Sequence, residues 1–99
     1  MKIGRRTKEW IRERAKLRRI YRKKGIMSCE VKLEKCMGVF GMSFAHRHKR
    51  IYYYDKPGLL GSFNETVRAC AYCHSEMEKD KDLTEEVFNR LRKKVELNN

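Results

Sequence analysis

The sequence lacks any long hydrophobic run, and this absence narrows the class of protein first. Its 99 residues contain no apolar stretch approaching the roughly 20 residues that a membrane-spanning helix needs. The first residues are also too densely charged for a secretory signal peptide. We therefore expect a cytoplasmic protein, in which reduced cysteines are available to bind metal.

Linkers, repeats and proline are scarce as well. The one proline, Pro57, stands beside Gly58 and marks a turn. No low-complexity linker or internal repeat divides the chain. A chain of this length forms one small domain with a modest core, and such a domain often needs a metal ion or a disulfide for stability.

Acidic residues are outnumbered by basic ones. The chain has 13 Asp and Glu against 25 Lys and Arg, which gives a net charge of +12. Twelve basic residues and two glutamates between Lys2 and Lys24 place a net +10 in the first quarter. This excess indicates a polyanionic partner, and nucleic acid fits it best. An anionic membrane is less favoured, because the segment lacks the bulky apolar face of an interfacial helix.

The N-terminal segment has the pattern of a basic helix. Thr7 is the expected N-cap and Gly25 the expected end, with Trp10, Leu17 and Tyr21 on one stripe. The stripe alone predicts a solvated helix docked on the core, and the dense charge predicts an arm that grips phosphates. The basic residues of this arm that we expect to contact DNA are Arg18, Arg19, Arg22, Lys23 and Lys24.

Two further elements follow in the rest of the chain. The apolar and aromatic residues between Val39 and Tyr54 favour a strand, after a bend at Gly38 and Gly41. Residues 76–97 have the pattern of a core-packing helix that Asp82 or Thr84 would cap, with its Lys and Arg on a solvated face. Its apolar positions recur every four residues, at Leu83, Val87, Leu91 and Val95.

The four cysteines form two pairs. Cys70 and Cys73 have the spacing of a zinc knuckle, whereas the six residues between Cys29 and Cys36 make a wider pair. Together they predict one closed four-thiolate zinc site that stabilises the fold and does not catalyse. A buried free thiol at Cys29 or Cys36, or a disulfide, remains the alternative.

Three histidines lie in the same zone as the cysteines. His46 and His48 would share a face if they belong to a strand, and His74 directly follows the knuckle, where it points away from the structural ion. We expect at least two of them to share a site for phosphodiester hydrolysis. One imidazole would take a proton from water, and Mg²⁺ or Mn²⁺ would neutralise charge developing on the phosphate. The bases expected to hold the cleaved backbone are Arg47, Lys49 and Arg50.

The stretches "AHR", "FNETV" and "CAYCH" contain His46, Asn64, Cys70, Cys73 and His74 in that order. Over residues 29–80 the pattern resembles the HNH endonuclease family in its ββα-metal form with a supporting zinc knuckle. The resemblance implies an α+β fold: a small ββα-metal (His-Me finger-like) domain, flanked by a basic N-terminal helix and a C-terminal helix. We divide the chain into an arm, residues 1–25, and a zinc-stabilised HNH-like domain, residues 26–99.

The resemblance also implies residue roles. His46 would be the general base, Asn64 would orient the loop that carries it, and His74 would ligate a catalytic divalent ion, with the site between the His46 strand and the His74 helix. Many family members have an acidic metal ligand where this chain has Ala45. His48, or Glu78 one helical turn after His74, is therefore a further candidate ligand.

The expected function is metal-dependent hydrolysis of DNA. Small HNH proteins are common in bacteriophage genomes, so phage packaging or replication proteins and the host cytoplasm are the implied setting. The main alternative is a non-catalytic, zinc-stabilised module that binds nucleic acid. An adaptor whose basic arm contacts an acidic protein has little support in the residues.

Overall fold

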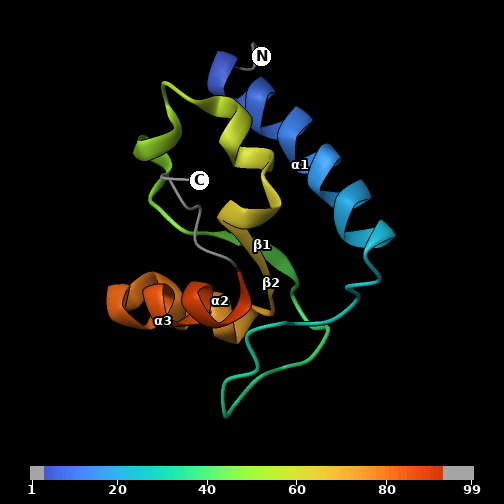
Figure 1. The fold of residues 1–99 in the computed structure, drawn as a ribbon, viewed down its shortest axis with the longest axis vertical. Coiled ribbons are helices and arrows are strands. Elements are labelled where there is room, and N and C mark those ends of the chain that lie inside the picture. Colours follow the sequence, from blue (N-terminus) through green and yellow to red (C-terminus); the bar gives the residue numbers. More distant parts are fainter. Residues whose placement is uncertain (1–3, 93–99) are drawn as a thin grey trace, which may run out of the picture.

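The computed structural model of the chain describes residues 4–92 and has an α+β fold (Figure 1). The helices and strands are α1 (Arg5–Lys23), β1 (Ser43–His46), β2 (Thr66–Ala69), α2 (Ala71–Lys79) and α3 (Lys81–Leu91). Three short 3-10 helices lie between the strands: η1 (Arg50–Tyr53), η2 (Pro57–Gly61) and η3 (Phe63–Glu65). The predicted α+β class is confirmed. Among the helices of residues 4–92, none has the length and apolarity that crossing a bilayer would require.

Helix α1 lies along one side of the sheet and buries a narrow stripe. Leu17 and Tyr21 are its buried residues, as the stripe predicts, and they pack against the strand residue Phe44. The helix begins after Gly4, so the predicted cap at Thr7 is wrong. Its end is confirmed, because Gly25 has a φ of 75°, a left-handed conformation that glycine adopts at helix ends without steric cost.

The two strands form an antiparallel sheet at the centre of the molecule. Ser43 pairs with Ala69 at one end and His46 pairs with Thr66 at the other. Helix α2 starts two residues after β2 and packs against the sheet, together with α3, on the side away from α1 (Figure 1). The sheet therefore separates α1 from the two C-terminal helices.

The strand predicted between Val39 and Tyr54 is much shorter than expected, because β1 ends at His46. The chain then turns into η1, where the ring of Tyr53 is only 1% exposed. The Tyr53 hydroxyl accepts a hydrogen bond from the main-chain N–H of His48 (3.2 Å) and donates one to a Glu65 carboxylate oxygen (2.9 Å). These two bonds hold the segment in a compact, folded-back conformation. An extended strand without a partner would not make them.

The predicted C-terminal helix, residues 76–97, is two helices, of which the first begins earlier than expected. They meet at Asp80, whose carboxylate accepts a hydrogen bond from the main-chain N–H of Leu83 (3.0 Å) and caps α3. The predicted caps at Asp82 or Thr84 are therefore wrong. The Thr84 hydroxyl instead donates to the carbonyl of Met77 in α2 (2.6 Å), which ties the two helices together.

The core-packing role of this helix is confirmed, because Val87 of the stripe and Phe88 beside it are fully buried. Val95 lies outside the described residues.

Each face of the sheet has its own apolar core. The core beside α1 is formed by Leu17, Tyr21 and Phe44. The core beside α2 and α3 is formed by Cys29, Val31, Ala45, Val67, Ala69, Cys70, Cys73, Met77, Val87 and Phe88.

A buried arginine forms an ion pair and hydrogen bonds with residues from several elements of the fold. Arg92, 7% exposed, follows α3 and forms a 2.7 Å ion pair with Glu30. Its guanidinium also donates to the hydroxyl of Tyr21 in α1 and to the carbonyls of Phe63 and Thr66, each at 3.0 Å. The prediction that the basic residues of this region lie on a solvated face is therefore wrong for Arg92.

Candidate metal centre and histidine site

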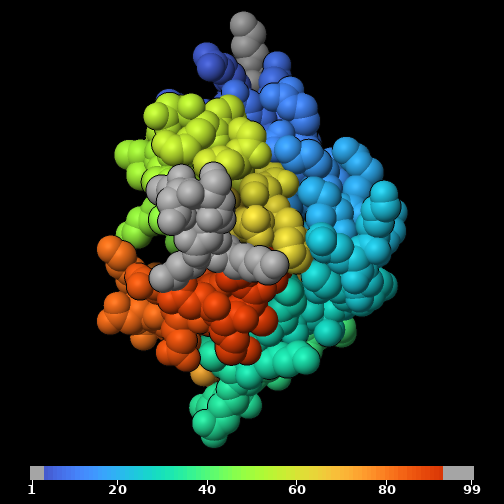
Figure 2. Space-filling model, viewed as in Figure 1, coloured from blue at the N-terminus to red at the C-terminus, as the bar shows by residue number. Residues whose placement is uncertain are grey.

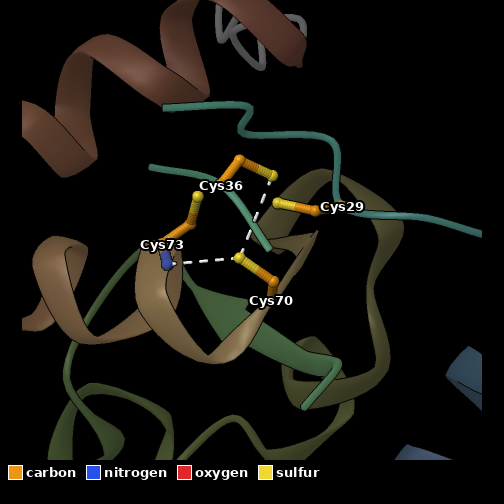
Figure 3. Close-up of side chains that lie close together, drawn as sticks. All are labelled: Cys29, Cys36, Cys70 and Cys73. Atoms are coloured by element: carbon orange, nitrogen blue, oxygen red, sulfur yellow. Dashed lines mark hydrogen bonds between the residues drawn. The ribbon is translucent and has the colours of Figure 1, made fainter. Parts of the chain in front are cut away.

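The four thiols converge on one point, from two segments with 33 residues between Cys36 and Cys70. Figure 3 shows Cys29, Cys36, Cys70 and Cys73 with their sulfurs turned toward one another. All four sulfur atoms lie within 4.8 Å of one another, and none is in a disulfide. We call this group the thiol cluster.

The dimensions of the thiol cluster fit a tetrahedral zinc ion. Zn–S bonds of about 2.3 Å place two sulfurs about 3.8 Å apart in a tetrahedron. The sulfurs of Cys36 and Cys70 are 3.9 Å apart. Because all four thiols converge, the wide spacing of Cys29 and Cys36 does not prevent this pair from contributing two sulfurs to the cluster. The thiols are thus positioned to hold a metal ion, as the cysteine pattern predicts.

Main-chain N–H groups surround the sulfur of Cys70. This residue is the N-cap of α2, and its sulfur accepts hydrogen bonds from the N–H groups of Cys73 (3.4 Å) and Met37 (3.3 Å). Burial opposes ionisation of Cys70, but these donors outweigh it and lower the thiol pKa to about 6. Burial raises the pKa of Cys73, and the neighbouring thiols of Cys70 and Cys29 raise it further, because a second thiolate beside the first is disfavoured. A bound cation would relieve that repulsion and favour thiolates at all positions.

Two glycines shape the loop that supplies Cys36, as the predicted bend suggests. Gly38 and Gly41 have φ values of 68° and 61°. The carbonyl of Gly38 accepts a hydrogen bond from the N–H of Cys29 (2.9 Å), which closes the loop beneath the sulfurs. A Cβ on Gly41 would lie 2.7 Å from that of Ala71, so a larger residue there would push α2 away from the loop.

His46 ends β1 and packs among aromatic rings. Its ring centroid is 5.2 Å from that of Trp10 in α1 and 5.4 Å from that of Tyr53. Its Nε2 lies 2.9 Å from the carbonyl oxygen of Leu60. Burial lowers the pKa of His46 below its ordinary value, although the bond to Leu60 acts in the opposite direction.

His74 occupies the first turn of α2, directly after the knuckle. Its Nδ1 is 2.5 Å from the hydroxyl oxygen of Ser43, at the start of β1. Its main-chain N–H donates to the carbonyl of Cys70, the first hydrogen bond of the helix. The imidazole therefore contacts β1 and is not a member of the thiol cluster. This agrees with the prediction that it points away from the structural ion.

The two imidazoles belong to opposite faces of β1. Alternate residues of a strand point to opposite sides, and Phe44 packs on α1, so His46 shares the α1 face. Ser43 faces α2, where it contacts His74. After burial, electrostatic interactions with Arg50 and then with His74 also contribute to the lowered pKa of His46. The expected cleft between the His46 strand and the His74 helix stays a prediction.

The additional metal-ligand candidates form no three-ligand group with His74. His48 follows the end of β1 and stacks on Tyr52, with ring centroids 3.9 Å apart, so the strand geometry assumed for it is wrong. Glu78 is exposed on α2, one helical turn after His74. Within residues 4–92, the thiol cluster is the one group of three or more Cys, His, Asp or Glu side chains arranged to hold an ion. The roles of His74, His48 and Glu78 as ligands of Mg²⁺ or Mn²⁺ stay predictions.

Asn64 lies in η3, where it supports the end of β1 through its main chain. Its carbonyl accepts a 2.8 Å hydrogen bond from the guanidinium of Arg47, the residue after His46. The N–H of Arg47 also donates to the carbonyl of Glu65 (2.9 Å). The predicted role of Asn64 in orienting the histidine loop stays a prediction, and the contact observed uses the Asn64 carbonyl rather than its side chain.

The basic residues expected to contact DNA divide into two groups. The side chain of Arg47 is largely buried by its contacts with η3 and lies over the ring of Phe88. The remaining candidates are exposed: Arg18, Arg19, Arg22, Lys23, Lys24, Lys49 and Arg50. The exposed group can reach a phosphate backbone, whereas Arg47 has a structural contact in this fold.

Three contacts of the histidines escape sequence reasoning. Ser43 meets His74 across 31 residues, and the Leu60 carbonyl meets His46 across 14. Trp10 is recognisable as an apolar position of the first helix, but nothing in the sequence indicates its contact with His46. No protein-family model, curated protein or solved structure matches the chain. The resemblance to HNH endonucleases therefore rests on the motif residues.

Proposed function

We propose that this chain is a zinc-stabilised DNA-binding protein that hydrolyses phosphodiester bonds, with a ββα-metal unit formed by β1, β2 and α2. The order of the elements supports the proposal. His46 stands at the end of the first strand, Asn64 in the connection before the second, and His74 in the first turn of the helix. This is the arrangement that the resemblance to the HNH family implies.

The observation that carries the proposal is the state of the His46 ring. A carbonyl oxygen can only accept a hydrogen bond, so the contact with Leu60 requires a proton on Nε2. The lowered pKa keeps the imidazole neutral at pH 7, which leaves a basic lone pair on Nδ1. A fixed, neutral imidazole with one free nitrogen is what a general base for water needs.

His74 would hold the catalytic ion. Its Nδ1 is occupied by Ser43, which leaves Nε2 as the nitrogen for a metal. A divalent ion there would take its remaining ligands from phosphate and water, as Mg²⁺ commonly does, and would neutralise charge on the phosphate. The exposed bases of α1, with Lys49 and Arg50, would hold the DNA backbone by contacts that weaken as salt rises.

A second candidate function is DNA binding without catalysis. It is favoured by the placement of His46 and His74 on opposite faces of β1, and because the described residues gather no group of three metal ligands beside His74. In this account His46 is a structural residue that Trp10 and Leu60 hold in place. The contact between Ser43 and His74 then serves only to join α2 to the sheet. The thiol cluster and the basic helix keep the same roles in both accounts.

Plasmid cleavage distinguishes the two candidates. Zinc-loaded protein is incubated with supercoiled plasmid and Mg²⁺, Mn²⁺ or Ni²⁺, and nicked product is measured over time. We expect His46→Ala to slow nicking about 100-fold or more, because a general base contributes that much. We expect His74→Ala to raise the metal concentration required, and Ser75→Ala, exposed beside it, to leave both quantities unchanged. DNA binding without cleavage under every metal would establish the second candidate.

A further inference from the structure

A group of aromatic and basic side chains lies outside the histidine site, on the segment that follows β1. Tyr52 is 42% exposed and Tyr54 is 44% exposed, while Tyr53 between them is buried and fixes the segment to the core. Isoleucine 51 beside them is 71% exposed. An exposed cluster of large rings on a small basic protein needs an explanation, because most such side chains are buried or interact with a partner.

Cations are already placed over these rings. The guanidinium carbon of Arg6 is 3.9 Å from the centroid of the Tyr54 ring, and the ammonium of Lys56 is 4.5 Å from that of Tyr52. His48 stacks on Tyr52 at 3.9 Å with 32° between the ring planes. These contacts form two groups around the segment after β1: His48 and Tyr52 with Lys56, and Tyr54 with Arg6 and Arg50. We call the two groups together the stacking surface.

The stacking surface is built from two elements far apart in sequence. Arg50, at the start of η1, lies over the ring of Trp10 in α1 at 5.6 Å, and Arg6 extends from the first turns of α1 to Tyr54. In Figure 2 the yellow-green segment that follows β1 lies directly against the blue first turns of α1. A pocket of about 330 Å³ opens beside Tyr54, lined by Gly4, Arg5, Arg6, Thr7, Glu9 and Tyr54.

The acidic groups near the stacking surface leave its charge positive. Glu9 lies within 3.7 Å of Arg5, and Asp55 forms a 2.9 Å pair with Lys56. The Asp55–Lys56 pair is exposed and therefore weak, so Lys56 can exchange Asp55 for a phosphate at little cost. Residues 47–56 contain four Lys or Arg and one Asp. The charge is thus complementary to a nucleic-acid backbone.

We propose that the stacking surface binds unpaired DNA bases, with the rings of Tyr52, Tyr54 and His48 as the stacking partners. A base in a duplex has both faces covered by its neighbours, so rings at a protein surface select unpaired bases. Basic side chains beside exposed rings are the combination that single-stranded nucleic acid requires, since the cations hold phosphates while the rings hold bases.

The proposal rests on the proposed function and makes its substrate more specific. Tyr53, whose neighbours in sequence form the stacking surface, also contacts the ring of His46. Nucleotides adjacent to a phosphate at His46 would therefore pass over Tyr52 and Tyr54. The chain would bind DNA that is single-stranded or locally opened more tightly than a continuous duplex.

Affinity for matched DNA probes tests the proposal. Fluorescence anisotropy measures binding of a labelled 20-nucleotide thymidine oligomer and of a 20-base-pair duplex at one fixed salt concentration, without a catalytic metal. We expect Tyr52→Ala with Tyr54→Ala to weaken binding of the single strand about 10-fold or more, because each lost stack contributes substantially. We expect the duplex to be affected less than about 2-fold. Phenylalanine at both positions retains the rings and should retain binding.

The same experiment can overturn the proposal. Equal loss for single strand and duplex, or no loss for either, would contradict base stacking. Loss with phenylalanine as large as with alanine would also contradict it, because the hydroxyls rather than the rings would then be the contact. The anisotropy experiment measures binding and not cleavage, so failure of catalysis and failure of stacking remain distinguishable. A wild-type protein that binds neither probe would instead reject the proposed function itself.

Discussion

The two faces of the sheet are stabilised by different chemistry. On the α2 side, four cysteines from segments far apart in sequence meet within 4.8 Å, in an arrangement that a single ion can fix. On the α1 side there is no such ligand group among the described residues, and packing of Leu17, Tyr21 and Phe44 holds the helix in place. The first side has the ligands for a stabilising ion, and the second depends on aromatic and aliphatic contacts that tolerate gradual change.

The comparison also concerns the histidines. His74 belongs to the side of the thiol cluster through α2, and His46 belongs to the α1 side through Trp10. Disturbing one side should therefore affect one histidine more than the other. The following predictions test this separation, beginning with the largest effect.

Loss of a zinc ligand should have the largest effect. In Cys70→Ser we expect loss of bound zinc and of cooperative unfolding on the α2 side, since structural zinc contributes on the order of 10 kcal/mol to small folds. Metal analysis and thermal unfolding followed by circular dichroism measure the two quantities. Ser75→Ala on the same helix serves as the control. A stable Cys70→Ser protein without zinc would show that the ion is not required for the fold.

Removal of the buried arginine should be the next largest effect and should involve both sides. Arg92→Ala removes the ion-pair partner of Glu30 and leaves its carboxylate with the N–H of Arg68 alone, while the Tyr21 hydroxyl keeps only Thr66. Because a buried charge then loses its counter-charge, we expect a loss of about 3–5 kcal/mol in the free energy of unfolding. Urea unfolding of the zinc-loaded protein provides the measurement. The double variant with Glu30→Gln should regain part of the loss. Equal stability of Arg92→Ala and wild type would contradict the network.

Truncation of Trp10 should change the α1 side alone. Burial lowers the pKa of His46, so Trp10→Ala should raise that pKa toward about 6.5, the value for a solvated imidazole. An NMR titration of the histidine ring protons measures the change, and Trp10→Phe should reproduce most of the wild-type value. Zinc content should stay constant. An unchanged His46 pKa in Trp10→Ala would show that this ring does not control the site.

The same histidine sets a pH dependence of stability. The folded-state pKa of His46 is depressed, so the unfolded state binds the proton more readily. Its contribution to stability is therefore complete above about pH 6.5 and is lost as pH falls through the folded-state pKa. Urea unfolding of wild type and His46→Gln between pH 7.5 and pH 4.5 should show a steeper decline in the wild type. Parallel declines would contradict the burial of this imidazole.

Neutralising the exposed bases of α1 should have the smallest effect on folding. Arg18→Gln with Arg22→Gln should change the free energy of unfolding by less than about 0.5 kcal/mol, because exposed side chains contribute little. The salt dependence of DNA binding should become shallower by about two units of slope. Affinity measured over a range of salt concentrations tests this, and an unchanged slope would place the DNA elsewhere on the protein.

The thiol cluster was predictable because metal ligation leaves a local spacing pattern. Cys70 and Cys73 lie three positions apart, so the first turn of a helix brings them together. The wide pair, Cys29 and Cys36, was weaker evidence, since its geometry depends on Gly38 and on contacts from the other pair. The basic helix and its buried stripe were equally predictable, from the periodic spacing of the apolar residues in the first segment.

The parts that sequence reasoning missed depend on contacts between distant residues. The segment after His46 has the aromatic content of a strand, but the buried Tyr53 hydroxyl bonds turn it into η1. Arg92 has the appearance of a surface residue until its partners in α1, η3 and the cysteine segment are known. The bond between Ser43 and His74 likewise has no local signature.

Absorption spectroscopy of the cobalt-substituted protein tests most directly whether thiols alone build the metal centre and leave the histidines free. Cobalt replaces zinc, and its bands report the number of sulfur ligands and the tetrahedral geometry. We predict a four-thiolate spectrum that is the same in wild type, His46→Ala and His74→Ala, and is altered in Cys36→Ser. A spectrum that changes in His74→Ala, or that stays unchanged in Cys36→Ser, would contradict this division between thiols and imidazoles.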